Sequence, residues 1–328
     1  MSTLATLLQA FFVDRLGRQR SVSQHTIASY RDTFRMLLVF ARGQTGKAPP
    51  DLAFEDFGAE LIVAFLEQGE EQRGNSVRTR NARLAAIHSF FHYASFELPE
   101  HVAQIQRVLA IPHKRGDRAL VSFLQPGELD AILNAPDDET WTGRRDRALL
   151  TLAAQSGLRV SELTNLRRAD LQLGPAPYVH CTGKGRKERR TPLTRRVAAV
   201  LRDWLTEQPR DDEFLFPSLH GGRLSPDAVQ LLIRKHTQTA AAQEPSLGDK
   251  TVTPHVLRHT CAMNMLQRGV DISVIALWLG HESVQTTQIY LHADMAIKRR
   301  ALALTAPAGP RPARYRPPEA LFAFLESR

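Results

Sequence analysis

The sequence predicts a mainly α-helical protein with one small antiparallel β-sheet, divided into an N-terminal helical domain and a larger mixed α/β domain. Apolar residues recur at three- and four-residue steps through most of the chain, which is the period of one helix face. A short alternating pattern around a glycine turn, typical of a β-hairpin, follows residue 177. A length of 328 residues is enough for two domains with separate cores.

The charge of the chain favours a polyanionic partner. Lys and Arg total 43 against 34 acidic residues, which gives a net charge of +9 and a pI near 10.0. Basic proteins gather nucleic acids because neutralising phosphates releases counterions. A solvated basic surface would have the same totals, so charge alone leaves both interpretations open.

Several classes of protein are disfavoured by the composition. No apolar run approaches the roughly 20 residues that span a bilayer, and the first residues lack the pattern of a secretory signal. Cys181 and Cys261 are the only two cysteines and form no paired motif, so neither a disulfide framework nor a Cys-rich zinc site is indicated. We therefore expect a cytoplasmic protein without a membrane segment.

Residues 1–110 are expected to form a helical domain. Its helices are predicted from the periodicity of SQHTIASYRDTFRMLLVFARG, ELIVAFLEQGEEQ and SVRTRNARLAAIHSFFHYASFE, with Ser76 as the N-cap of the last. Arg78, Arg80 and Arg83 near the start of that helix are spaced to form a basic patch. Residues 111–122, which include Lys114 and Arg115, have little periodicity and are expected to be a basic linker.

Residues 123–305 are expected to form the second domain. Two helices come first, then the strands YVHCT and ERRTPL on either side of the turn GKGRK, then further helices, one of them with Ser225 as N-cap and Pro226 at its first position. Residues 306–328 form a Pro-rich tail that ends in the apolar segment ALFAFLE. Proline prevents a regular helix through the first part of that tail.

Four segments of the second domain concentrate polar groups suited to phosphate chemistry. SGLRVSEL places Arg159 at a helix start, where the backbone adds positive potential, with Glu162 one turn later to orient it. TGKGRKERR places Lys184 between two glycines. The remaining two segments are HVLRH and LGHESVQTTQIYLH. Each segment also has an ordinary structural interpretation, such as an ion pair, a surface turn, a capping histidine or a core tyrosine.

His255 and His259 lie four residues apart, a spacing also found in helical zinc sites. The second position of the motif is Val256, so the glutamate of an H-E-x-x-H zinc protease is missing. Arg258 next to His259 would also oppose a cation. We therefore expect no metal site, and we interpret His259 as a core histidine.

Taken in order, SGLRVSEL, GKGRKERRTPL, HVLRH, LGH and TTQIY closely resemble the tyrosine recombinase, or phage-integrase, family, with Xer-like and transposon-borne integrases most similar. The motifs span about residues 159 to 293. The resemblance implies a mixed α/β catalytic domain preceded by a helical core-binding domain that clamps DNA. It extends more loosely to the N-terminal helices, chiefly through SVSQHTIASYRDTFRMLLVF.

The resemblance also implies roles for individual residues. The positions that match the family's catalytic residues are Arg159, Lys184, His255, Arg258, His281 and the nucleophile Tyr290, with Glu162 in support. Lys187 competes with Lys184 for the hairpin position, and the GKG context favours Lys184. The residues expected to contact DNA are Arg78, Arg80, Arg83, Lys114, Arg115 and Lys187. The implied reaction cleaves DNA through a 3′-phosphotyrosine link and uses neither metal nor ATP.

The implied partners are double-stranded DNA and further copies of the chain. Family members assemble as tetramers on two DNA sites and exchange a C-terminal segment, here either KRRALAL or ALFAFLE. Partner recombinases and accessory DNA-bending proteins are also compatible with the family. Two other functions remain open: nicking and religation like a type IB topoisomerase, and DNA binding by a chain whose catalytic set has decayed.

Overall fold

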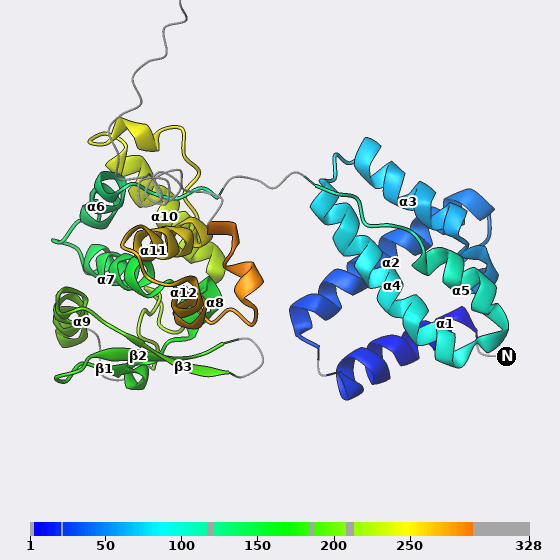
Figure 1. The fold of residues 1–328 in the computed structure, drawn as a ribbon, viewed down its shortest axis with the longest axis horizontal. Helices are drawn as coiled ribbons and strands as arrows, with labels where there is room; N and C mark the ends of the chain where they lie inside the picture. Colours follow the sequence, from blue (N-terminus) through cyan, green and yellow to red (C-terminus); the bar gives the residue numbers. More distant parts are fainter. Residues whose placement is uncertain (1–2, 21, 117–120, 184–186, 208–212, 291–328) are drawn as a thin grey trace, which may run out of the picture. The chain divides into compact units, whose positions relative to one another are not determined.

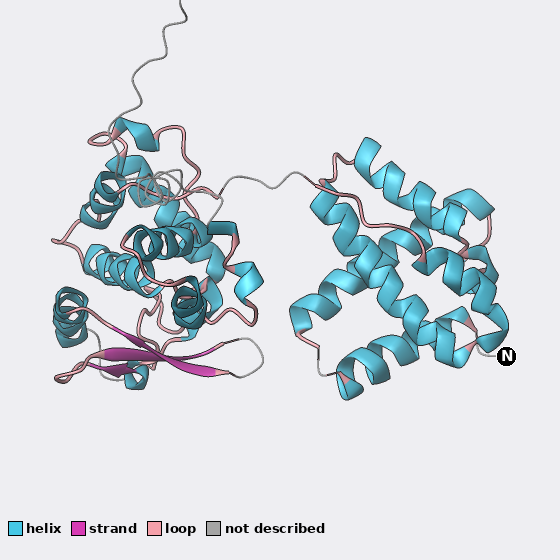
Figure 2. Cartoon of the chain, in the orientation of Figure 1, coloured by secondary structure: helices cyan, strands magenta, loops and turns pink. Residues whose placement is uncertain are grey.

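The computed structural model describes residues 3–20, 22–116, 121–183, 187–207 and 213–290. It separates into two compact units, Met1–Arg118 and Ala119–Arg328, which we describe one at a time (Figure 1). The fold class is as predicted, because the described residues are mainly helical and contain one small antiparallel sheet (Figure 2). The predicted tail, residues 306–328, lies outside the described residues.

The N-terminal unit is built from helices in its described part. They are α1 (Leu4–Ala10), the π-helix η1 (Phe11–Gln19), α2 (Gln24–Thr45), α3 (Ala59–Glu71), α4 (Val77–Glu97) and α5 (Val102–Leu109), with short 3-10 turns between them. The predicted cap at Ser76 is confirmed, because its hydroxyl accepts a hydrogen bond from the backbone N–H of Thr79 at 3.2 Å. Helix α2 ends at Gly46, whose φ of 70° suits glycine.

Aromatic rings fill the core of this unit. Phe34 on α2 and Phe90 on α4 lie 5.2 Å apart in an edge-to-face arrangement, and Phe11 of the π-helix packs against both. Such aromatic pairs add about 0.5–1.5 kcal/mol to the free energy gained by burying their area. The three helices are thereby held together at the points where the periodicity of the sequence places apolar residues.

The segment expected to be a linker begins as part of this unit. Ile111 is buried in the N-terminal core. The backbone carbonyl of Pro112 accepts a hydrogen bond from Arg80 at 3.0 Å, and the backbone N–H of Lys114 donates to the side chain of Asn81 at 3.0 Å. Residues 111–114 therefore lie along α4, because α4 offers them an apolar site and two polar partners.

In the C-terminal unit a small sheet lies along one edge, and most of the helices lie on one side of it (Figure 2). Its helices are α6 (Pro126–Asn134), α7 (Trp141–Ser156), α8 (Val160–Asn165), α9 (Arg195–Glu207), α10 (Pro226–Ala240), α11 (Pro254–Gln267) and α12 (Ile272–Leu279). The predicted cap at Ser225 is confirmed by a 3.0 Å hydrogen bond from the backbone N–H of Ala228, with Pro226 at the first helical position. Apart from strand β1 (Leu171–Gln172), the described helices and strands of this unit follow the predicted order.

The sheet has the order β1-β2-β3 and is antiparallel throughout. Strands β2 (Tyr178–Thr182) and β3 (Glu188–Pro192) form the predicted hairpin, with Cys181 opposite Arg189. The backbone N–H of Gly183 donates to the carbonyl of Lys187 at 2.7 Å and closes the hairpin. Strand β1 (Leu171–Gln172) was not predicted, because two residues are too short to show an alternating pattern.

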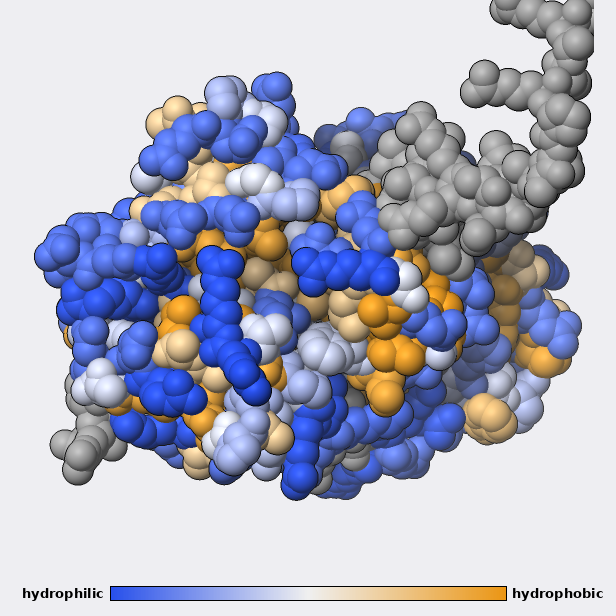
Figure 3. Space-filling model, turned by 60° about the vertical axis from the view of Figure 1, so that its left-hand side comes forward, coloured by the Kyte–Doolittle hydropathy of each residue, from blue (hydrophilic) through white to orange (hydrophobic). Residues whose placement is uncertain are grey.

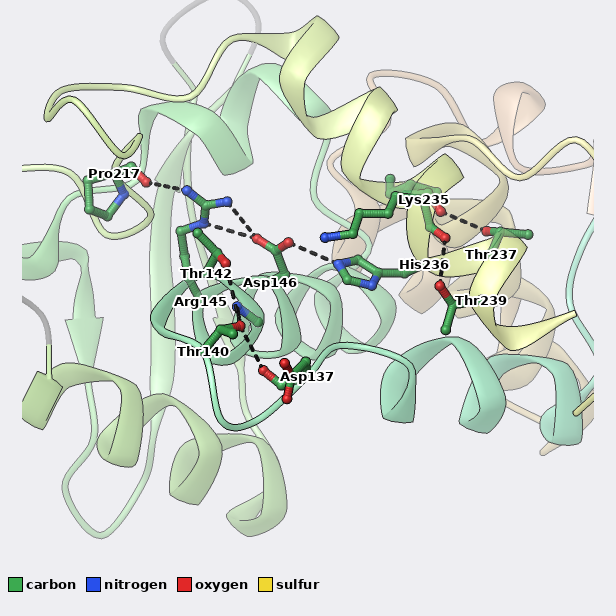
Figure 4. A network of polar contacts seen from close by, with 12 residues as sticks. Asp137, Thr140, Thr142, Arg145, Asp146, Pro217, Lys235, His236, Thr237 and Thr239 are labelled. Carbon is green, nitrogen blue, oxygen red and sulfur yellow. Dashed lines mark hydrogen bonds and ion pairs between the residues drawn. The ribbon is translucent and has the colours of Figure 1, made fainter. Parts of the chain in front are cut away.

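A buried polar network connects α7 to α10 (Figure 4). Asp146 accepts two hydrogen bonds from Arg145, at 3.0 and 2.7 Å, and lies 2.9 Å from Nε2 of His236 on α10. Arg145 also donates to the carbonyl of Pro217 at 2.9 Å. Because each of these groups would be costly to bury alone, the network fixes α7, α10 and the segment around Pro217 in one arrangement.

No described helix combines the length and apolarity needed to cross a membrane. The face drawn in Figure 3 is covered mainly by hydrophilic residues, with smaller apolar patches among them.

Candidate active site

Arg159 lies between two helices of the C-terminal unit. Helix α7 ends at Gly157, whose φ is 62°, and Arg159 is the N-cap of α8. Glu162 accepts hydrogen bonds from the backbone N–H of Arg159 at 2.8 Å and from its guanidinium at 2.9 Å. The Glu162 carboxylate therefore both caps the helix and orients the arginine, as the SGLRVSEL spacing predicted.

Arg189 on β3 is a member of this cluster that the sequence analysis did not identify. Its guanidinium binds both oxygens of Glu162, at 3.0 and 2.7 Å. Burial alone would raise the pKa of Glu162, but the hydrogen bonds from Arg189 and Arg159 lower it below its ordinary value. In the sequence, Arg189 is one of several charged residues in KERR, and only the register of the hairpin shows which one faces inward.

Gly280 leaves room for Arg189. A Cβ atom at this position would lie 2.7 Å from Nη1 of Arg189, and the φ of Gly280 is 65°. A side chain here would therefore meet both backbone strain and a clash with the guanidinium. This explains the glycine that follows α12 in the LGH segment.

Arg258 is buried within the same cluster. It lies on α11, is 3% exposed, and donates to the backbone carbonyls of Gly157 at 2.6 Å and Leu279 at 2.8 Å. Burial, together with the charge of Arg159, lowers its pKa to about 10. The guanidinium is therefore still charged near neutral pH.

His281 follows α12 and is partly buried. Its Nδ1 lies 2.7 Å from the hydroxyl of Thr287. Burial and the charges of Arg258 and Arg159 lower the pKa of His281 to about 4. The ring is therefore neutral near pH 7 and can donate one hydrogen bond to a bound anion.

Tyr290 is the last described residue and is almost completely buried, with 1% of its surface exposed. It packs in a small apolar cluster with Met263, Ile275 and Leu279, among others. Its hydroxyl lies 2.9 Å from Nδ1 of His259. Burial raises the pKa of Tyr290 to about 12, although the charge of Arg258 acts in the opposite direction.

His259, which we interpreted from the sequence as a core histidine, lies on α11 beside Tyr290. The ring is half-buried, as expected, but its Nδ1 contacts the hydroxyl of the predicted nucleophile. His255, one turn earlier on α11, is exposed and packs edge-to-face against His259 with ring centroids 5.1 Å apart. In the sequence, the feature that could have indicated this contact is the position of His259 directly after Arg258 in HVLRH.

In the described part of the chain, no group of three or more His, Cys, Asp or Glu side chains is arranged to hold a metal ion. Lys184 lies outside the described residues. Lys187 is exposed, and its carbonyl closes the hairpin.

The candidate DNA contacts in the N-terminal unit differ in their exposure. Arg78 and Arg115 are exposed, and Lys114 is exposed but pairs with Glu70 at 2.7 Å. Arg80 does not belong to an exposed patch: it is 6% exposed and donates to the Pro112 carbonyl. Arg83 is half-buried over the ring of Phe65. Of the three arginines predicted to form a basic patch, Arg78 is therefore the exposed one, because α4 turns Arg80 and Arg83 towards the protein.

The arrangement suits the binding of an oxyanion. Arg159 and Arg258 come from different elements but reach the same end of α12, and both influence the pKa of His281. An arginine has five N–H donors, so each guanidinium keeps donors for a ligand after making its backbone contacts. Paired guanidiniums next to a neutral histidine and a tyrosine hydroxyl can bind a phosphodiester and present a nucleophile to it.

Comparison with known proteins agrees with these observations. The profile of the Phage integrase family matches residues 122–296, and that of the phage integrase N-terminal SAM-like domain matches residues 10–97. A Sinorhizobium fredii protein named as an integrase/recombinase, y4rC, is 58% identical over 99% of this chain and 98% of its own length. The tyrosine recombinase XerC of Chlamydia trachomatis is 32% identical over 88% of this chain and 94% of its own.

Solved structures share the fold. The Tn1549 transposon integrase in complex with circular intermediate DNA superposes with a TM-score of 0.70 at 15% identity, over 93% of this chain and all of that one. The XerH site-specific recombinase in its post-cleavage complex gives a TM-score of 0.66 at 20% identity, over 87% of this chain and 81% of that one.

Proposed function

This chain belongs to the phage integrase family and is a tyrosine-type site-specific recombinase; on this premise we propose that it cleaves and rejoins DNA through a 3′-phosphotyrosine intermediate formed by Tyr290. The observation that carries the proposal is the convergence of Arg159, Arg258 and Tyr290 around α12. The tyrosine oxygen attacks the phosphorus, and the 5′-oxygen leaves. The covalent link keeps the energy of the phosphodiester, so that rejoining needs neither ATP nor a metal.

The two arginines bind the non-bridging oxygens of the scissile phosphate. Attack on phosphorus increases the negative charge on these oxygens, and guanidiniums that are already in place stabilise it. His281 donates one further hydrogen bond, since its neutral ring has one N–H. Each preorganised donor of this kind contributes on the order of 3–4 kcal/mol to the transition state.

Lys184 is the proposed general acid, and Lys187 is its alternative. The acid protonates the leaving 5′-oxygen, which requires a side chain that reaches the far side of the phosphate. The hairpin that β2 and β3 form carries Lys187 at its described edge. A comparison of Lys184→Ala with Lys187→Ala on a 5′-phosphorothiolate substrate distinguishes the two, because a sulfur leaving group needs no acid.

The proposed substrate is double-stranded DNA, bound by both units. Lambda integrase has been solved as a tetramer on a Holliday junction and XerH on its difH site. We propose that this chain likewise assembles as a tetramer on two DNA sites and that its subunits exchange a C-terminal segment. That segment is either KRRALAL or ALFAFLE, and both lie outside the described residues. Such a reaction would serve to integrate or excise a mobile element, or to resolve a replicon, in the cytoplasm. Partner recombinases and DNA-bending proteins are compatible with it.

A two-site plasmid tests recombination against simple religation. The target site is first selected from randomised duplex DNA by binding to the full chain, and two copies are then placed in direct repeat on a supercoiled plasmid. A recombinase excises the intervening segment as a circle. Relaxed plasmid without the excised circle would instead indicate activity like that of a type IB topoisomerase, and unchanged plasmid would indicate a DNA-binding protein without catalysis.

A further inference from the structure

The hydroxyl of the proposed nucleophile already has a specific partner in the protein. Nδ1 of His259 lies 2.9 Å from Oη of Tyr290, and the two rings pack edge-to-face with centroids 5.5 Å apart. His281, by contrast, directs its Nδ1 to Thr287 at 2.7 Å, and His255 is exposed one turn away on α11. Among the hydrogen bonds given for the described residues, the one between Nδ1 of His259 and Oη of Tyr290 involves the tyrosine oxygen itself.

We propose that His259 is the proton acceptor for Tyr290 and therefore a catalytic residue of this chain, a role that rests on the proposed phosphotyrosine chemistry. With its own hydrogen on Nε2, the imidazole accepts the phenolic hydrogen bond at Nδ1. The distance is already within the range needed for direct proton transfer, without an intervening water. His259 thus differs from the positions that the family resemblance indicated.

The proposed step balances. As Oη of Tyr290 forms its bond to phosphorus, the phenolic proton moves to Nδ1 of His259, which becomes an imidazolium. The bond from phosphorus to the 5′-oxygen breaks, and that oxygen takes a proton from the general acid. Rejoining reverses each transfer: the 5′-hydroxyl attacks, its proton returns to the acid, and the imidazolium returns its proton to the departing tyrosine oxygen.

The surroundings of His259 keep its ring neutral, although they also make it a weaker base than an exposed histidine. Burial, His255 and Arg258 lower the pKa of His259 to about 4, so the ring is neutral and its lone pair is available. His281 and Tyr290 are the other titratable groups beside it. Because the pKa of Tyr290 is raised to about 12, the phenol does not ionise by itself near neutral pH. A bound phosphate opposes the charge of Arg258 and makes protonation of His259 easier.

His259→Asn separates proton transfer from positioning. The Oδ1 atom of asparagine lies close to the place of Nδ1 and accepts a hydrogen bond, but it does not take up a proton. The rate of the covalent adduct is measured on a nicked duplex carrying the selected site, from pH 6 to pH 9, beside wild type. His220→Asn serves as the matched control, because His220 is an exposed histidine of the same unit.

We expect His259→Asn to bind the duplex with unchanged affinity and to form the adduct on the order of 100-fold more slowly at pH 7, the lower end of the usual contribution of a general base. Its rate should rise about tenfold per pH unit, because only the phenolate then reacts, while wild type varies little. A fluorinated tyrosine at position 290, a stronger acid, should restore much of the lost rate. His220→Asn should behave like wild type.

Two results would distinguish the proposed role of His259 from the proposed phosphotyrosine chemistry. If wild type forms the adduct and His259→Asn matches its rate and pH profile, the role of His259 is overturned and the phosphotyrosine proposal stands. If wild type forms no adduct, the proposed function itself fails. Thermal unfolding of each variant is recorded, and should His259→Asn be unfolded at the assay temperature, His259→Gln is used for the same comparison.

Discussion

Arg159 and Arg258 donate hydrogen bonds to consecutive backbone carbonyls at the end of α12, Arg159 to Gly280 at 3.0 Å and Arg258 to Leu279 at 2.8 Å. The carbonyls at a helix C-terminus carry partial negative charge, which favours cations. One helix end thus holds two guanidiniums close together although they would repel each other. The backbone at the end of α12 therefore holds both guanidiniums in place, as the proposed phosphate-binding role requires.

Arg258→Lys should lower the rate of DNA cleavage by a factor of about 10²–10³, the usual effect of removing one preorganised donor. A lysine cannot donate to Gly157 and Leu279 in the forked geometry of the guanidinium. The measurement is the rate of adduct formation under single turnover, with Arg268→Lys as a control at an exposed position of the same unit. An Arg258→Lys rate equal to that of the control would contradict the account.

Glu162→Gln should destabilise the C-terminal unit by on the order of 3–5 kcal/mol, because it removes the charge between Arg159 and Arg189. The folded-state pKa of Glu162 lies below its ordinary value of 4.5. Its contribution to the free energy of unfolding is therefore complete above that value and is lost as the pH falls through the folded-state pKa. Denaturant titrations at several pH values test this.

The matched control for that titration is Glu282→Gln, because Glu282 is exposed. It should leave the unfolding free energy nearly unchanged at every pH. If Glu162→Gln and Glu282→Gln had equal stabilities, the carboxylate between the two arginines would not have the structural role that its contacts indicate.

His259 and His281 should both remain neutral in the free protein through the pH range in which histidine ordinarily titrates. Burial lowers the pKa of each to about 4. In the unfolded chain both rings take up a proton near pH 6.5, whereas in the folded protein they do so only near pH 4. Both histidines therefore lower the free energy of unfolding as the pH falls from about 6.5 towards 4. Nitrogen-15 spectra of the imidazoles should show two rings that do not change between pH 5.5 and 8, and ordinary titration of both would refute the prediction.

Arg78→Ala should affect DNA binding, whereas Arg80→Ala should affect thermal stability. Arg78 is exposed, so its loss should weaken DNA binding and reduce the slope of log affinity against log salt by about 1. Arg80 is buried against Pro112 and Glu70, so its loss should lower the melting temperature instead. Binding isotherms at several salt concentrations and thermal unfolding of both variants measure this. Equal salt slopes for the two variants would contradict the assignment.

The sequence predicted those features that depend on local pattern. Helix periods, the caps at Ser76 and Ser225, and the β2–β3 hairpin follow from residues near one another in the chain. The pairing of Arg159 with Glu162 follows in the same way, since the two lie one helical turn apart.

The features that depended on tertiary contacts were not predicted. Arg189 reaches Glu162 only through the register of the hairpin. His259 reaches Tyr290 only because α11 and the segment after α12 pack together. Arg80 is buried because residues 111–114 fold back along α4. In each case the partner lies far away in the chain, and a periodic pattern contains no information about it.

The most direct test of the central claim is the covalent adduct itself. Full-length protein is incubated with a nicked duplex carrying the selected site, in EDTA and without ATP, and is resolved under denaturing conditions. Wild type and the control Tyr178→Phe should form a protein–DNA adduct whose linked peptide contains Tyr290, and Tyr290→Phe should form none. An adduct that persists in Tyr290→Phe, or that requires a metal ion, would contradict the account.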